Sequence, residues 1–201
     1  MNERMRHLLD QLNELEVEIE SEMNHQKKKW FYEVQGRRVE FEHSIKDAHR
    51  RLKIGVIHWF MSVRFFDYLT APIIYGMVFP LFVFDLLIMF YQFTCFPIYG
   101  IARVKRSDYF SFDHRHLSYL NLIEKFDCLY CSYANGLMGY ASEIIACTEQ
   151  YFCPIKHAQK LLGSHKRNRY FLEYGDASDL HKRLEKVRSS LLRENDNKPI
   201  P

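Results

Sequence analysis

One run of 33 residues, from Leu69 to Ile101, constrains this chain more than any other feature, because it contains a single charged side chain, Asp85. About 20 consecutive apolar residues are enough to cross the hydrocarbon core of a bilayer. The run therefore predicts a membrane anchor, and the alternative is an unusually apolar pair of buried helices in a soluble domain. Tyrosines toward its ends are typical of rings at the headgroup level: Tyr68, Tyr91 and Tyr99.

Both flanks of the run are basic, with HRRLK at residues 49–53 and RVKR at residues 103–106. Lys and Arg near a membrane segment favour the cytoplasmic side, so both ends of the run are expected there. This pattern predicts a helical hairpin or a re-entrant anchor in a bacterial inner membrane, with both soluble flanks cytoplasmic. Residues 54–66 are expected to form an amphipathic helix at the interface.

Asp85 stands near the middle of the apolar run. An ionisable group at membrane depth costs about 2.5–3.5 kcal/mol on insertion scales, so we expect Asp85 to be paired, protonated or facing water. One hypothesis is a contact with a proton or a substrate. The alternatives are a polar turn at the apex of a short re-entrant hairpin and a helix–helix contact in an oligomer.

The whole chain is expected to be mainly α-helical and membrane-associated, in four segments. Residues 1–53 are predicted to form an N-terminal helix, a β-hairpin at residues 30–42 and the start of a linking helix. Residues 54–102 contain the interfacial helix and the anchor, with its apolar core at residues 69–101. Residues 103–177 are predicted to form a helical Cys/His domain, and residues 178–201 a C-terminal amphipathic helix with a frayed tail.

The N-terminal helix has an apolar seam with alternating spacings of four and three residues. This spacing is typical of a short coiled coil, and it predicts self-association or contact with another membrane protein. Packing against the rest of the same chain is the alternative. The seam consists of Leu8, Leu12, Leu15 and Ile19.

Charge and motif content limit the class of function. The formal net charge is +3; residues 1–53 hold 11 basic and 11 acidic side chains, and residues 103–201 hold 16 and 12. A nucleic-acid-binding domain would have a pI above about 9 and a one-sided basic patch, so nucleic acid is not an expected partner. The sequence lacks a Gly-rich phosphate loop, a Gly-x-Ser-x-Gly elbow and a His-Glu-x2-His motif. It therefore assigns no reaction.

Four of the five cysteines occur within 26 residues. Such a cluster, behind an N-terminus without an apolar signal sequence, favours metal or redox chemistry over a disulfide framework. One ligand set is a Cys₃His site for zinc, in which a turn at Asn135-Gly136 would close the Cys-x2-Cys loop. Replacing the histidine with Cys147 gives four thiolates suited to an iron–sulfur cluster. Reduced structural cysteines and a redox-active Cys128/Cys131 dithiol are the alternatives. The zinc set is Cys128, Cys131, Cys153 and His157.

A basic run with interleaved aromatic residues follows the cysteine cluster. On a membrane-attached protein such a run is expected to contact anionic lipid headgroups. A stacking surface for single-stranded nucleic acid is the alternative, which the small basic excess disfavours. Its basic residues are Lys156, Lys160, Lys166, Arg167 and Arg169.

These features predict a membrane-anchored accessory or scaffold protein with a Cys/His metal site, structural zinc being favoured, on the cytoplasmic face. The alternative is a membrane-surface redox protein or enzyme that holds an iron–sulfur cluster or a dithiol and acts with a lipid or a quinone.

Overall fold

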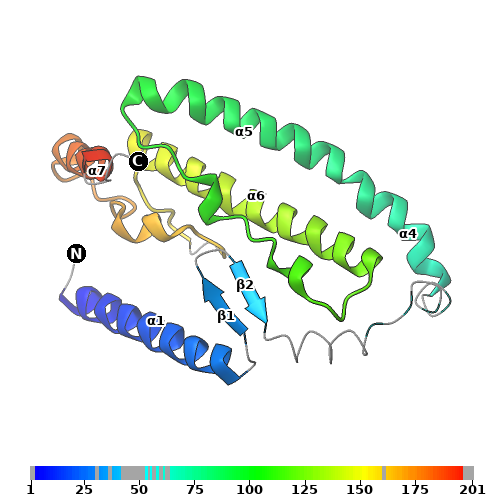
Figure 1. The fold of residues 1–201 in the computed structure, drawn as a ribbon. Helices are drawn as coiled ribbons and strands as arrows, with labels where there is room; N and C mark the ends of the chain where they lie inside the picture. The colour runs from blue at the N-terminus through cyan, green and yellow to red at the C-terminus, as the bar shows by residue number, and fades with distance from the viewer. Residues whose placement is uncertain are drawn as a thin grey trace. The chain divides into compact units, whose positions relative to one another are not determined.

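A computed structural model describes residues 3–29, 32–35, 38–41, 53, 55, 58, 61, 64–159 and 162–196 (Figure 1). The chain is mostly helical and divides into two compact units. The first unit is Met1–Ser62 with Phe112–Leu129, and the second is Val63–Ser111 with Tyr130–Pro201. Most of the predicted linking and interfacial helices lies outside the described residues.

The first unit contains a long helix and a two-stranded antiparallel sheet. Helix α1 (Glu3–Lys29) is followed by β1 (Tyr32–Gln35) and β2 (Arg38–Phe41), which pair in the register Tyr32 opposite Phe41. A short 3₁₀ helix, η2 (Asp113–His116), also belongs to this unit. The apolar seam of α1 is exposed along its length, at Leu8, Leu12, Leu15 and Ile19, with exposed fractions between 45% and 60%.

The second unit contains the apolar run as helices α4 (Phe65–Gly76) and α5 (Val78–Tyr99), which lie in line (Figure 1). The break between them follows from Pro80, which has no N–H to donate to the carbonyl four residues earlier, at Gly76. Together they form one apolar helical stretch, Phe66–Tyr99, long enough to cross a membrane. The chain does not double back within it, so the predicted hairpin with its apex at Asp85 is not observed.

Helix α5 ends in a glycine cap that reverses the chain. Gly100 has a left-handed φ of 70°, and the N–H of Ile101 donates to the carbonyl of Phe96 at 2.9 Å. This is the Schellman arrangement, in which the residue after the left-handed glycine packs back on the helix. The following residues return along α5 and include the 3₁₀ helix η1 (Arg106–Asp108).

Helix α6 (Leu122–Phe152) begins with a reciprocal cap. The side chain of Asn121 accepts hydrogen bonds from the N–H groups of Ile123 and Glu124, both at 2.9 Å, and Glu124 accepts one from the N–H of Asn121 at 2.8 Å. Each side chain thus satisfies backbone donors that the first turn of a helix leaves unpaired.

From Tyr130 onward, α6 runs parallel to α4 and α5. The rings of Tyr75 and Tyr130 are 6.3 Å apart near the start of this contact, and those of Tyr99 and Tyr151 are 5.1 Å apart near its end. A parallel pair requires the connection to travel back along the helices, and the reversal at Gly100 provides that path.

A hydrophobic core joins α5, α6 and the C-terminal helix α7 (Leu180–Asp196), which overlaps the predicted helix at residues 178–193. Gly136 allows the return segment to approach α6, since a Cβ atom there would lie 2.8 Å from the carbonyl oxygen of Tyr109. The core consists of Ile88, Phe96, Ile101, Leu137, Tyr140, Ala141, Ile144, Cys147 and Leu191.

Candidate functional site

Helix α5 buries polar side chains and exposes apolar ones, which is the reverse of a helix on the surface of a soluble protein. Two of its four buried residues are polar, and these four follow one face at spacings of three and four: Asp85, Ile88, Gln92 and Phe96. The outward residues are large and apolar. They include Phe79, Leu87, Phe90 and Phe93, each at least 57% exposed. Only 11% of the most apolar window is buried. Polar residues inside and apolar residues outside are expected when the surroundings are lipid.

Asp85 is buried, at 5% exposure, and is bound by two partners from the same chain. The two terminal nitrogens of Arg106 donate to its two carboxylate oxygens, Nη2 to Oδ2 at 2.7 Å, and the hydroxyl of Tyr133 donates to Oδ2 at 2.9 Å. A two-pronged contact of this kind is among the stronger charge-assisted hydrogen bonds in proteins. Asp85 is therefore paired as expected, but it lies within a continuous helix and its partners come from its own chain.

The surroundings keep both donors of this cluster protonated. Hydrogen bonding to Asp85 raises the pKa of Arg106 above its ordinary value. Burial, followed by the hydrogen bond to Asp85, raises the pKa of Tyr133 to about 12. The guanidinium also lies 4.1 Å from the ring centre of Phe110, a distance at which a cation is attracted to the ring face.

Gln92 makes the second polar contact on the buried face of α5. Its Oε1 accepts from the backbone N–H of Val104 at 2.8 Å, and its Nε2 donates to the hydroxyl of Tyr140 at 2.9 Å. Gln92 thus satisfies the backbone of the return segment and a buried phenol together. Burial raises the pKa of Tyr140, so its hydroxyl is neutral at physiological pH.

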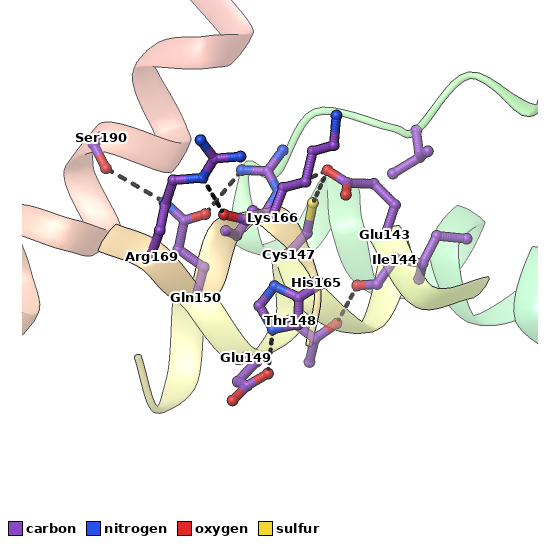
Figure 2. Close-up of polar contacts among 12 residues, drawn as sticks. Glu143, Ile144, Cys147, Thr148, Glu149, Gln150, His165, Lys166, Arg169 and Ser190 are labelled. Carbon is purple, nitrogen blue, oxygen red and sulfur yellow. Dashed lines mark hydrogen bonds and ion pairs between the residues drawn. The ribbon is translucent and has the colours of Figure 1, made fainter. Parts of the chain in front are cut away.

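A second polar cluster lies on the C-terminal half of α6 (Figure 2). The Nε of Arg167 donates to Glu143 at 2.7 Å, and its Nη1 donates to Gln150 at 2.8 Å. The amide of Gln150 in turn donates to the hydroxyl of Ser190 at 3.3 Å. The cluster therefore ties the segment after α6 and helix α7 to the same face of α6.

Two further groups extend this second cluster, as Figure 2 shows. His165 is in hydrogen-bond contact with Glu149, with Nε2 2.8 Å from Oε2. The thiol of Cys147 donates to Glu143 at 3.9 Å. The alternative iron–sulfur ligand is thus a buried side chain held by a carboxylate.

The structure places the Cys-x2-Cys pair inside a helix. Cys128 and Cys131 both belong to α6, which continues without a turn through Asn135-Gly136. The prediction of a turn at Asn135-Gly136 is wrong. Gly136 lies within α6, and its lack of a side chain allows the return segment to approach the helix closely. From Cys131 to Phe152 the helix rises about 30 Å, at about 1.5 Å per residue. Cys131 therefore lies far from Cys153, which directly follows the last residue of α6.

Cys153 and His157 follow the end of α6 and are exposed, and residues 153–157 are not helical. Among the described residues, which include all five cysteines, no group of three or more His, Cys, Asp or Glu side chains could hold a metal ion. The predicted zinc site and its iron–sulfur alternative with Cys147 stay predictions that this geometry does not support.

The predicted headgroup-binding run is divided by internal contacts. Lys156 donates to Glu173 at 2.6 Å, and Arg167 is bound within the second polar cluster. Lys160 lies outside the described residues. Lys166 is exposed, and Arg169 lies 5.8 Å from the ring centre of Tyr170. Contact of the run with lipid stays a prediction, and three of its four described cations, Lys156, Arg167 and Arg169, already have partners in the chain.

Two residues that hold Asp85 were not singled out as site residues from the sequence. Arg106 was noted only as part of a basic flank, and nothing in the sequence points to Tyr133. Gln92 could have been found, because a second polar residue seven positions after Asp85 lies on the same helix face. No protein family model matches the chain, and no curated protein or solved structure shows significant similarity to it.

We expect Arg106→Leu to be much more destabilising than removal of both charges. The single change leaves a buried carboxylate without its cation, which costs about 3–5 kcal/mol of unfolding free energy, whereas the Asp85→Leu/Arg106→Leu pair leaves no uncompensated charge. Thermal unfolding in mild detergent, followed by circular dichroism, measures the difference. Lys105→Leu, at an exposed neighbour, is the control. A double variant as unstable as the single one would contradict the buried-pair account.

We expect the cysteines to differ sharply in reactivity. Cys131 and Cys153 are exposed and Cys147 is 2% exposed. Brief alkylation of the native protein, followed by peptide mass spectrometry, should label the first two and leave Cys147 unlabelled until denaturation. A zinc chelator should change nothing. Protection of Cys131 and Cys153 that a chelator removes would instead show that they bind metal.

Proposed function

We propose that the protein is a membrane-anchored scaffold that is held in the bilayer by α4 and α5 and presents α1 to a helical partner. The observation that supports the anchor is the inverted polarity of α5, with Asp85 and Gln92 covered by the chain and large apolar side chains facing outward. Basic flanks on both sides of the anchor favour the cytoplasmic face of a bacterial inner membrane as its location.

Energetics favour lipid as the surroundings of this surface. Moving one large apolar side chain out of water is worth about 1.5–3 kcal/mol. The exposed faces of α4 and α5 present many such side chains in one contiguous stretch, and soluble monomers rarely expose a large apolar patch. Those with an exposed fraction of 60% or more are Phe66, Leu69, Ile73, Phe79, Leu87, Phe90 and Ile98.

The scaffold part of the proposal depends on α1. Its seam residues Leu8, Leu12, Leu15 and Ile19 are all exposed, and their spacing matches the a and d positions of a coiled coil. A 27-residue helix provides more than three heptads of length. We propose that a second copy of the chain covers this seam.

Phe90→Lys should weaken vesicle binding about 100-fold without unfolding the protein. The side chain is 70% exposed, so the change places a charge in the lipid contact and leaves the core untouched. Flotation with phospholipid vesicles measures binding, and circular dichroism checks the fold. His181→Lys, at an exposed position of α7, adds a charge elsewhere as the control. Equal flotation of Phe90→Lys and the wild type would argue against the anchor.

Leu12→Glu/Ile19→Glu should convert a self-associated protein to a monomer, because both charges fall on the seam. Light scattering coupled to size-exclusion chromatography in detergent measures the mass. Val17→Glu/Ser21→Glu adds the same charge on the face of α1 away from the seam and should leave the assembly intact. A monomeric wild type would show that a second copy does not cover the seam.

A further inference from the structure

The return segment after Gly100 is fixed to the second unit at three positions. Ile101 is buried, Val104 is hydrogen-bonded to Gln92, and Arg106 is paired with Asp85. Between these fixed points Arg103 and Lys105 are exposed. An extended segment directs successive side chains to opposite sides. Because Val104 packs against the core and Arg106 is paired with Asp85, the intervening Lys105 and the preceding Arg103 lie on the other side.

The two cations lie beside the apolar surface of α5. The guanidinium of Arg103 is 4.9 Å from the ring centre of Phe93, and that ring is itself 57% exposed. We call Arg103 and Lys105 the cationic strip. The contact between Arg103 and the exposed ring of Phe93 joins this strip to the apolar surface of α5. This combination is typical of the headgroup level, where aromatic rings and basic side chains meet the phosphates.

The position of the strip argues against a helix that crosses the bilayer. Arg106 is bound to Asp85, close to the midpoint of Phe66–Tyr99, and the exposed Arg103 and Lys105 are its near neighbours. In a transmembrane orientation centred on this midpoint, the exposed Lys105 would lie within the hydrocarbon beside Arg106, and Arg103, which lies on Phe93, would be near its edge. The stretch is also about 50 Å long at 1.5 Å per residue, against a hydrocarbon thickness of about 30 Å. An orientation along the surface avoids both conflicts.

We propose that α4 and α5 lie along the surface of the bilayer, with their apolar side in the lipid, and that Arg103 and Lys105 bind the headgroup phosphates of anionic phospholipids at the edge of this contact. The proposal rests on the membrane anchor proposed above and adds its orientation and its lipid class. In an extended segment two residues apart, the Cα atoms are separated by about 6.6 Å, which lets both cations contact one headgroup or two adjacent ones.

Vesicle binding tests the lipid class. Wild-type protein should bind vesicles of phosphatidylcholine with phosphatidylglycerol more tightly than vesicles of phosphatidylcholine alone. Since each cation near an anionic surface contributes about fivefold, Arg103→Ala/Lys105→Ala should lower affinity for the anionic vesicles about 25-fold and leave binding to the neutral vesicles unchanged. Lys182→Ala/Lys186→Ala removes two exposed cations from α7 and is the matched control for net charge.

The outcomes separate this proposal from the one on which it rests. Wild-type protein that binds neither vesicle overturns the membrane anchor. Wild-type protein that binds both vesicles equally, or a loss in the control variant as large as that in Arg103→Ala/Lys105→Ala, leaves the anchor and overturns the headgroup strip. Circular dichroism of each variant in detergent excludes unfolding as the cause of a loss.

Depth-dependent quenching tests the orientation in the folded protein. Phe79, Leu86 and Phe93 are exposed and spaced by seven residues, so they lie on one face of α5, about 10 Å apart. Each is replaced by Trp in a Trp30→Phe/Trp59→Phe background, and brominated phospholipids report the depth. Equal, shallow depths support the surface orientation. A difference of about 10 Å in depth between any two of the three probes, as a helix that crosses the bilayer requires, overturns it.

Discussion

The contact between Asp85 and Arg106 determines how the second unit is built. A carboxylate on an apolar helix must be covered and paired, because an isolated buried charge is costly. Its partner comes from the segment that follows α5, so the chain has to turn back after Gly100 and run beside the helix it has just completed. Tyr133 from α6 binds the same carboxylate, so one ion pair fixes three parts of the chain. The polar side of α5 is then fully occupied, and its apolar side is left for an external contact.

Glycine placement makes this arrangement possible at two points. Gly100 adopts a left-handed conformation that other residues rarely adopt, and this gives the chain its reversal. Gly136 has no side chain where the carbonyl of Tyr109 approaches α6, so the return segment can pack against the helix. The first glycine directs the segment toward α5, and the second gives it room. The ion pair then stabilises a path that the backbone already permits.

Several elements follow from the sequence alone, and the failures share a physical cause. The apolar run, the helical character of the chain and the need for a partner of Asp85 can all be predicted from local composition and the cost of burying charge. The identity of that partner could not, since Arg106 and Tyr133 meet Asp85 only through a reversal and a parallel helix. Closeness in sequence was also a poor guide to how close the cysteines are in space. A Cys-x2-Cys pair indicates a metal knuckle only where the chain turns, and here a continuous α6 separates Cys131 from Cys153. The glycine in Asn135-Gly136 is equally compatible with a turn and with a close contact on a helix, so the sequence does not distinguish the two.

The contacts of the basic residues show why counting charges along a sequence is a weak guide to lipid contact. The run from Lys156 to Arg169 looks like a headgroup-binding stretch, yet Lys156 and Arg167 are each bound to a glutamate of the same chain. The shorter flank after α5 has fewer cations, but the contacts of Val104 and Arg106 leave Arg103 and Lys105 exposed, with Arg103 on the ring face of Phe93. A cation is available to lipid when its neighbours, and not itself, are tied to the fold. In this chain the ion pair that covers Asp85 therefore also decides which cations of the return segment stay exposed.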